Sequence, residues 1–189
     1  MVYLTRTSGQ LKSSLIKWTA TVNSASEYVQ ATRERSPVHR YVADNGESVA
    51  KQEIEHTRVA GHRIALSEAV TADERTLVKE AIRATTRSNK ACFVNALKMW
   101  EFDSRFKYAE GFAVMTDLSL DGTEHAWCML DGKKLVDVTR AFDHYHGAII
   151  TDPDVLARYT GSELTAYGII GNRRDQYEFL RERGYMDDR

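Results

Sequence analysis

The chain has 189 residues, of which 42% are hydrophobic and 28% are charged, and its net charge at pH 7 is -1. This composition is typical of a globular protein and excludes a disordered or fibrous one, and the length suits one domain of ordinary size. The near-neutral charge provides no attraction for nucleic acid or for an anionic membrane, so we expect neither as a partner. The sequence leaves the oligomeric state open.

The sequence also limits the compartment. No apolar run approaches the roughly 20 residues that a membrane helix needs, and the N-terminus lacks the uninterrupted apolar run of a signal peptide. The two cysteines, Cys92 and Cys128, are too few for a disulfide framework in a chain of this size. We therefore expect a cytoplasmic protein in which both thiols are free. No Cys/His spacing resembles a structural zinc site, so we expect no metal.

In chain order, residues 8–35 carry apolar side chains at roughly helical spacing and predict one or two helices, which Pro37 would end. The sequence Asp44-Asn45-Gly46 then lies between two short β-compatible runs and predicts a hairpin. The polar run over residues 52–63 fits no pattern.

A capping box predicts the start of the next helix. The Thr71 side chain can accept a hydrogen bond from the backbone amide of Glu74, and the Glu74 side chain can reach back. Apolar residues continue on one face, so we expect this helix to run to about Thr86. A second helix is predicted over Ala91–Trp100, and it places Cys92 within its first turn.

Three β-type segments follow, over residues 107–117, 124–130 and 133–139. Asp121-Gly122 and Asp131-Gly132 supply the turn residues between them.

A fourth strand is predicted over residues 147–150, a short helix from Thr151, and a charged helix over residues 172–183. We therefore predict an α+β fold in which an antiparallel sheet packs against the cysteine-bearing helix. Residues 71–189 would form this core, and residues 1–70 a helical and hairpin extension within the same domain.

These elements place a cysteine at a helix start, a histidine on one strand and an aspartate on the next. The unpaired amides at a helix start favour the thiolate form of a cysteine. His125 can take the thiol proton, and Asp137 can bind the other ring nitrogen and fix its orientation. Equal offsets from the Asp131-Gly132 turn place His125 and Asp137 opposite or diagonal to each other. The competing interpretation is that Cys92 is a buried apolar residue and His125 a structural histidine.

The local sequence resembles a known family. His125-Ala-Trp127 followed by a turn and Leu-Val-Asp137-Val-Thr139 resembles the transglutaminase-like part of the papain-like cysteine superfamily. The strand beginning Tyr108-Ala-Glu-Gly111-Phe is similar to the family's preceding strand. Cys92 occupies the position of the family's nucleophile. The resemblance covers roughly residues 72–140.

The resemblance implies a Cys-His-Asp triad and cysteine-dependent acyl transfer without a required cofactor. It implies that Cys92 is the nucleophile, His125 the general base and acid, and Asp137 the residue that orients the imidazole. The sequence departs from the family at Phe93 and Val138, where the family often has tryptophan and proline. It also lacks a clear second oxyanion donor.

Two amide side chains lie nearest the cysteine in the sequence, and we consider Asn89 and Asn95 as candidate oxyanion donors. Trp127, His144 and His146 are candidates for lining the substrate cleft. A metal-dependent enzyme using His144 and His146 would need a third ligand, which the sequence does not place.

We therefore expect a hydrolase, deamidase or transferase that acts through a Cys92 thioester. Its substrate would be a protein or peptide, or a small amide or amine. The alternative is a catalytically degraded fold that serves as a protein-binding module. We expect Cys128 to be buried and inert.

Overall fold

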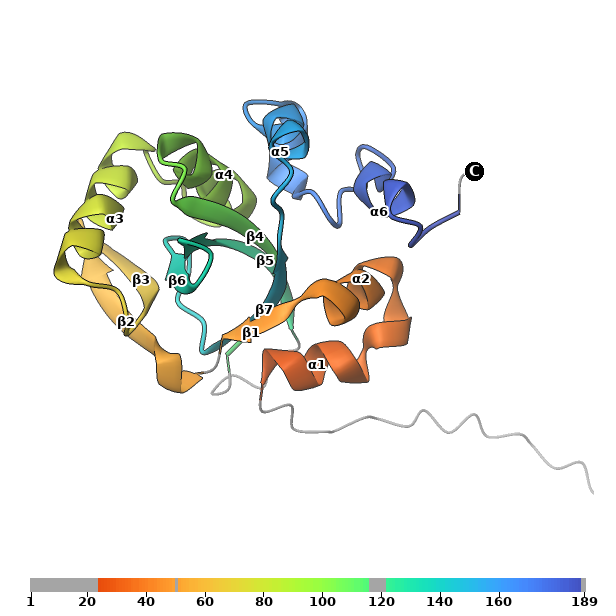
Figure 1. Ribbon diagram of the computed structural model, residues 1–189, viewed down its shortest axis with the longest axis horizontal. Helices are drawn as coiled ribbons and strands as arrows, with labels where there is room; N and C mark the ends of the chain where they lie inside the picture. Colours follow the sequence, from red (N-terminus) through yellow and green to blue (C-terminus); the bar gives the residue numbers. More distant parts are fainter. Residues whose placement is uncertain (1–23, 50, 116–121, 188–189) are drawn as a thin grey trace, which may run out of the picture.

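A computed structural model describes residues 24–49, 51–115 and 122–187. It contains one antiparallel sheet of seven strands, in the order β1-β7-β4-β5-β6-β3-β2. The sheet curls into a half-barrel, and the helices lie around its outer face (Figure 1). The predicted α+β class and antiparallel sheet are therefore confirmed. The strands are β1 (Glu47–Val49), β2 (Ile54–Val59), β3 (His62–Ser67), β4 (Phe106–Val114), β5 (Thr123–Leu130), β6 (Lys134–Asp137) and β7 (His144–Ile149).

Six α-helices are assigned within the described residues, together with three short 3₁₀ segments. None of these helices is long and apolar enough to span a membrane. The helices are α1 (Ala25–Ala31), α2 (Pro37–Asn45), α3 (Ala72–Ala84), α4 (Cys92–Phe102), α5 (Pro153–Tyr159) and α6 (Glu178–Glu182), and the 3₁₀ segments are η1 (Arg33–Arg35), η2 (Lys51–Glu53) and η4 (Glu163–Tyr167).

The two faces of the sheet bury separate apolar clusters. The larger cluster lies between the sheet and the helices on its outer face, and includes Phe106, Tyr108 and Cys128. The smaller cluster lies on the inner face and includes Trp127 and Tyr145. Because successive side chains of a strand point to opposite faces, neighbours such as Trp127 and Cys128 belong to different clusters.

The structure corrects two predictions in the N-terminal third. Pro37 begins α2 instead of ending a helix. Proline suits the first turn of a helix because the N–H that it lacks would have no partner within the helix there. The Ser36 side chain caps the helix. Asp44-Asn45-Gly46 does not form a hairpin. Its first two residues end α2, and Gly46 leads into β1, which pairs with β7.

The polar run over residues 52–63 contains most of the hairpin formed by β2 and β3. Ala60 and Gly61 both have positive φ at its turn. β2 is an edge strand whose side chains are mostly exposed or half-buried, so it has no apolar pattern. Residues 47–67 thus contribute three strands to the sheet that holds β4–β7.

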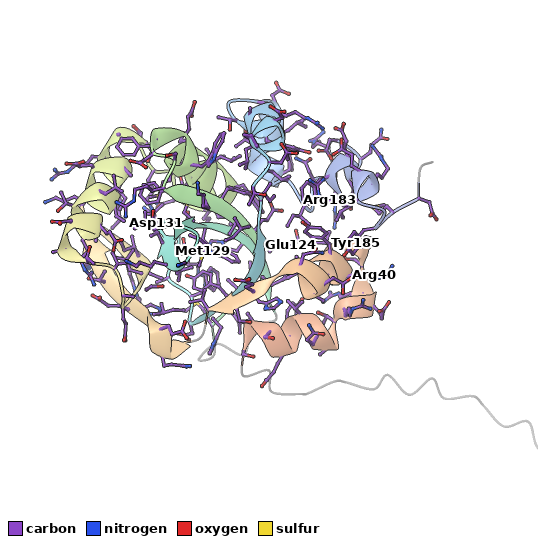
Figure 2. The ribbon with its side chains drawn as sticks, viewed as in Figure 1. Arg40, Glu124, Met129, Asp131, Arg183 and Tyr185 are labelled. Carbon is purple, nitrogen blue, oxygen red and sulfur yellow. The ribbon has the colours of Figure 1, made fainter. Side chains whose placement is uncertain are left out.

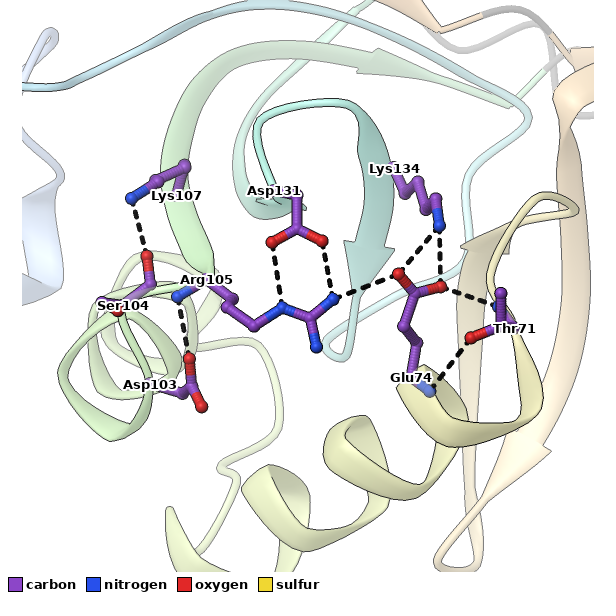
Figure 3. A network of polar contacts seen from close by, with 8 residues as sticks. All are labelled: Thr71, Glu74, Asp103, Ser104, Arg105, Lys107, Asp131 and Lys134. Atoms are coloured by element: carbon purple, nitrogen blue, oxygen red, sulfur yellow. Dashed lines mark hydrogen bonds and ion pairs between the residues drawn. The ribbon is translucent and has the colours of Figure 1, made fainter.

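The predicted capping box at the start of α3 is confirmed. Thr71 Oγ1 accepts a hydrogen bond from the backbone N–H of Glu74, and Glu74 Oε2 accepts one from the backbone N–H of Thr71. The Glu74 carboxylate also accepts hydrogen bonds from Lys134 Nζ at 2.8 Å and from Arg105 Nη2 at 3.2 Å (Figure 3). Arg105 in turn binds both oxygens of Asp131. This network joins α3 to both ends of the β5–β6 hairpin turn region and to the start of β4.

The predicted meander is confirmed as β4, β5 and β6, and the turn at Asp131-Gly132 has the two positive φ values that its sequence predicts. Asp121 lies outside the described residues. The fourth strand, β7, starts three residues earlier than predicted, at His144. The predicted C-terminal helix over residues 172–183 is shorter than expected, because only Glu178–Glu182 are α-helical.

Helix α6 and the segment that follows it pack against α2 (Figure 2). Tyr41 meets the rings of Phe179 and Tyr185 edge-on, at centroid distances of 5.2 and 5.1 Å. Asn45 Nδ2 donates a hydrogen bond to Tyr185 Oη at 2.9 Å. The C-terminal part of the chain therefore packs against one of its first described helices.

Candidate functional site

Cys92 is the first residue of α4 and is half-buried. Ala91 occupies the N-cap, where an alanine side chain has no atom that could accept hydrogen bonds from the first amides of the helix. Lys90 has a positive φ of 59°, so the chain turns sharply just before the helix begins. The predicted position of Cys92 in the first turn is confirmed.

His125 and Asp137 lie on neighbouring strands and are joined by a hydrogen bond. The β5–β6 register pairs Cys128 with Val136, and extending it places Asp137 opposite Trp127 and diagonal to His125. The His125 Nε2–H donates to Asp137 Oδ2 at 2.7 Å, since a carboxylate can only accept. Only 3% of His125 and none of Asp137 is exposed to solvent. The contact is therefore a buried, charge-assisted hydrogen bond.

The Asp137 carboxylate accepts three further hydrogen bonds. Tyr145 Oη donates to Oδ2 at 2.9 Å, and the backbone amides of Thr139 and Arg140 donate to Oδ1 at 2.8 and 3.2 Å. Burial, followed by the charge of Asp137, raises the pKa of Tyr145, which keeps this phenol protonated as a donor. Four donors thus fix the carboxylate in one orientation toward His125.

The environment of His125 favours its protonated form. Burial alone lowers the pKa of the imidazole, but the charge and hydrogen bond of Asp137 outweigh burial, and a hydrogen bond and charge interaction with Cys92 add to this effect. Together they raise the pKa of His125 to about 9. Because Nε2 is bound to Asp137, the nitrogen that remains for Cys92 is Nδ1. Asp137 is thus bonded to His125 directly, and Cys92 is close enough to affect the pKa of the imidazole.

His125 lies beyond the paired part of β5 and β6. The ladder between these strands ends at Cys128 and Val136, three residues short of His125.

Aromatic rings surround the other sides of His125. The ring centroids of Phe142, Trp127 and Tyr145 lie 4.8, 6.2 and 6.2 Å from that of the imidazole. Trp127 also lines a hollow of about 420 Å³ on the inner face of the sheet, together with Met129. The indole thus forms one wall of this hollow, which is not lined by Cys92, His125 or Asp137.

Gly147 makes room for this indole, whereas Gly111, its partner on β4, allows close approach of the β7 backbone. The two residues are paired across β4 and β7. A Cβ atom on Gly147 would lie 2.5 Å from the Trp127 ring and 2.6 Å from the backbone oxygen of Glu110. Any side chain at residue 147 would therefore displace the tryptophan.

The two amides considered as oxyanion donors have other contacts. Asn95 Nδ2 donates to the Ser88 backbone oxygen and to Thr139 Oγ1, both at 2.8 Å, and Oδ1 accepts from the Ser88 amide at 2.9 Å. Asn95 would have to release one of these bonds to stabilise an oxyanion. Asn89 is exposed, and its Oδ1 accepts a hydrogen bond from Arg87 at 3.2 Å.

The histidines considered for the cleft lie on β7. Strand alternation places His144 and His146 on the outer face of the sheet, opposite Tyr145. His146 is buried, and its Nδ1 lies 2.7 Å from Ser48 Oγ. The structure thus separates both histidines from His125 and Asp137.

Cys128 is buried, and its thiol donates a hydrogen bond to the backbone oxygen of Ala96 in α4 at 3.3 Å. Burial raises the pKa of the Cys128 thiol, and the nearby charge of Asp137 adds to this. The burial expected for this residue is therefore confirmed.

A second buried carboxylate lies on β4. Glu110 accepts hydrogen bonds from Tyr108 Oη at 2.7 Å and from the amides of Ile169, Ile170 and Gly171 at 2.7, 3.0 and 3.3 Å. Burial raises the pKa of Glu110 to about 7, although these hydrogen bonds act in the opposite direction. The loop after η4 is thereby fixed to the middle of the sheet.

Sequence reasoning missed two residues that contact the site, Tyr145 and Arg87. Tyr145 lies between His144 and His146, and strand alternation alone predicts that it points to the opposite face of the sheet from these histidines. Arg87 contacts the backbone just after Asp137, and no local pattern indicates this. Within residues 24–49, 51–115 and 122–187, no group of three or more His, Cys, Asp or Glu side chains is placed to hold a metal ion.

Comparisons with protein-family models, with curated proteins and with solved structures found no match.

Proposed function

We propose that the chain is a cysteine-dependent acyl-transfer enzyme with a transglutaminase-like core. In this proposal Cys92 is the nucleophile, His125 the general base and acid, and Asp137 the residue that orients the imidazole. The observation that supports it most is the buried 2.7 Å hydrogen bond between His125 and Asp137, beside a cysteine that begins a helix.

In the proposed reaction, Cys92 and His125 react as a thiolate–imidazolium pair, in which the thiol proton is held on His125 Nδ1, and the sulfur attacks the carbonyl carbon of the substrate. A C–S bond forms, and the bond to the leaving amine or alcohol breaks as that group takes the proton from His125. Water or an amine then attacks the thioester, with His125 again acting as base, and the thiol is regenerated. Asp137 keeps the proton on Nε2 throughout, so that Nδ1 is free to act.

The start of α4 would supply the oxyanion donors. The first amides of a helix have no partner within the helix, and Ala91 offers no side-chain acceptor for them. The backbone N–H of Cys92 is therefore a candidate donor to the oxygen that becomes negative during attack. A negative charge at this position is also stabilised by the helix dipole.

The proposal leaves the acyl acceptor open, since hydrolysis, deamidation and transfer to an amine share one thioester. The substrate would be a protein or peptide, or a small amide or amine. A reducing compartment such as the cytoplasm would keep the Cys92 thiol available.

Acylation by p-nitrophenyl acetate tests the proposal without knowledge of the natural substrate. We expect release of p-nitrophenolate and an acetyl group on Cys92, detected by peptide mass spectrometry. Cys92→Ala and His125→Gln should abolish both signals. Cys128→Ala is the matched control, because this second thiol is buried and its replacement should leave both signals unchanged.

Two outcomes would contradict the enzyme proposal. One is turnover that persists in Cys92→Ala, and the other is an acetyl group found on Cys128 or on lysines but not on Cys92. Hydroxylamine distinguishes the two kinds of adduct, because it cleaves a thioester and leaves an amide intact.

A protein-binding module with a degraded site is the second candidate function. The engagement of both N–H groups of Asn95 favours it, because this amide is then not available as an oxyanion donor. A protein that fails to acquire an acetyl group on Cys92, while His125 still titrates with a raised pKa, would support this second candidate.

A further inference from the structure

The segment between α3 and α4 is tied to the end of β6 by the half-buried side chain of Arg87. Arg87 Nε donates a hydrogen bond to the Val138 backbone oxygen, and Nη2 donates one to the Thr139 backbone oxygen at 2.7 Å. Nη1 lies 2.9 Å from Nδ1 of His62, on β3. One guanidinium therefore joins the approach to α4 to two strands of the sheet.

Asn95 makes the second connection, from inside the helix. It is 1% exposed and lies three residues after Cys92, on the same side of α4. Its amide bonds both backbone groups of Ser88 and the hydroxyl of Thr139. The loop before α4, the helix itself and the strand end are thus held by a single side chain.

Thr139 carries this connection to the carboxylate. Its hydroxyl accepts from Asn95, its backbone oxygen accepts from Arg87, and its backbone amide donates to Asp137 Oδ1 at 2.8 Å. The helix that begins with Cys92 and the carboxylate that orients the imidazole are therefore bonded to the same residue.

The backbone between α3 and α4 has conformations that these hydrogen bonds can stabilise. Thr86 and Lys90 have positive φ values of 48° and 59°, which are unfavourable for residues with a Cβ atom. Such conformations persist where the surrounding contacts over-determine them. The hydrogen bonds of Arg87 and Asn95 lie between and beside these two residues.

We propose that Arg87, Asn95 and Thr139 form a clasp that sets the position of Cys92 relative to His125 and Asp137. This inference rests on the proposed function of those three residues. It makes Asn95 a positioning residue and gives it a role other than that of an oxyanion donor.

A matched pair of variants at Thr139 tests the clasp. Thr139→Val removes the hydroxyl and keeps the shape and the backbone bonds, whereas Thr139→Ser keeps the hydroxyl. We expect acylation of Cys92 by p-nitrophenyl acetate to fall by about tenfold or more in Thr139→Val, because small misplacements of reacting groups cost factors of this size. Thr139→Ser should restore the rate to within about twofold of the wild type.

A second readout does not depend on acyl transfer. The titration midpoint of His125, followed by NMR, should fall in Thr139→Val as it falls in Cys92→Ala, because both changes remove the influence of Cys92 on the imidazole. It should remain at the wild-type value in Thr139→Ser. Arg87→Met provides the same test should Thr139→Val fail to fold, with the exposed Arg83→Met on α3 as its control.

The outcomes separate the two proposals. A wild-type protein that shows no acylation of Cys92, but whose His125 midpoint falls in Thr139→Val, overturns the proposed function and supports the clasp. A folded Thr139→Val protein with unchanged acylation and an unchanged His125 midpoint overturns the clasp and leaves the proposed function standing.

Discussion

Replacement of Asp137 by asparagine tests the electrostatics of the site most directly. In the wild type, the pKa of His125 is raised from its usual 6.5 to about 9. At 1.36 kcal/mol per pKa unit, this shift corresponds to about 3 kcal/mol of preference for the imidazolium over the neutral ring. Because the pair is buried, solvent screening removes little of this energy.

The raised pKa of His125 determines how the stability of the protein changes with pH. A histidine whose folded pKa lies above its unfolded pKa stabilises the protein fully below pH 6.5, and this stabilisation is lost as pH rises through about 9. In Asp137→Asn the charge is gone, while burial continues to lower the pKa of His125. We therefore expect its titration midpoint to fall to 6.5 or below, and about 3 kcal/mol of stability at pH 6 to be lost with it.

The variant should also disturb the proposed chemistry. With its oxygen kept toward the amides of Thr139 and Arg140, the asparagine presents its N–H₂ group to His125 Nε2, which must then accept. The proton moves to Nδ1, the atom that would take the thiol proton, and in a comparable hydrolase triad this change costs about 10⁴ in rate.

The assay is an NMR titration of His125 from pH 5 to 10, with urea unfolding at pH 6 and pH 9.5. His125→Gln assigns the signal among the six histidines of the chain. A His125 midpoint that stays near 9 in Asp137→Asn, or a loss of stability that is the same at both pH values, would show that Asp137 does not hold the imidazole in its charged form.

Three further predictions concern other parts of the chain. Iodoacetamide should label Cys92 at least about a hundredfold faster than Cys128, because Cys128 is buried and its raised pKa keeps the thiol protonated; equal rates in peptide mass spectrometry would contradict this. The pKa of Glu110 is about 7 in the folded protein against an ordinary 4.5. The stability of the wild type relative to Glu110→Gln, measured by urea unfolding, should therefore fall by about 3 kcal/mol as pH rises from 4.5 to 8. A stability difference that stays constant with pH would show that this carboxyl does not titrate in this range. Gly147→Ala should lower the free energy of unfolding by about 3 kcal/mol or more, because its Cβ would lie 2.5 Å from the buried indole of Trp127. Gly171→Ala is the control and should cost less than about 1 kcal/mol, because the nearest atom to its Cβ would be 3.4 Å away. Similar losses in both variants would argue against a close approach of Gly147 to the indole.

The elements that could be predicted are those whose signals lie within a few residues. Thr71 and Glu74 form their capping box with each other, and Asp131-Gly132 carries the positive φ values of its own turn. The diagonal placement of His125 and Asp137 follows from counting residues on either side of that turn. Such features depend little on the rest of the chain.

The predictions that failed rest on residues that occur in two kinds of local structure. Proline both ends helices and suits their first turn, and at Pro37 the burial of Val38 and Val42 against the rest of the protein decides for a helix start. Gly46 resembles a turn glycine, but a Cβ there would lie 2.5 Å from the Val42 backbone oxygen, so its reason is a close approach. β2 was not predicted because an exposed edge strand needs no apolar alternation.

Contacts between distant segments could not be predicted at the site. Arg87 and Tyr145 reach the neighbourhood of Asp137 from opposite sides of the sequence, across the sheet. Their placement depends on the strand order, in which β7 pairs with β4 and not with β6. Strand order is set by the packing of the whole core, and no short stretch of sequence indicates it.

The pairing of β1 with β7 also has a consequence for synthesis on the ribosome. Ser48 and His146, which face each other in this ladder, are 98 positions apart in the chain. β1 therefore has no partner until β7 has been translated, and such non-local pairing is slow to form. Cys92 is translated before His125, Asp137 and Tyr145, so the nascent chain carries this thiol for some time before the groups that would control it exist.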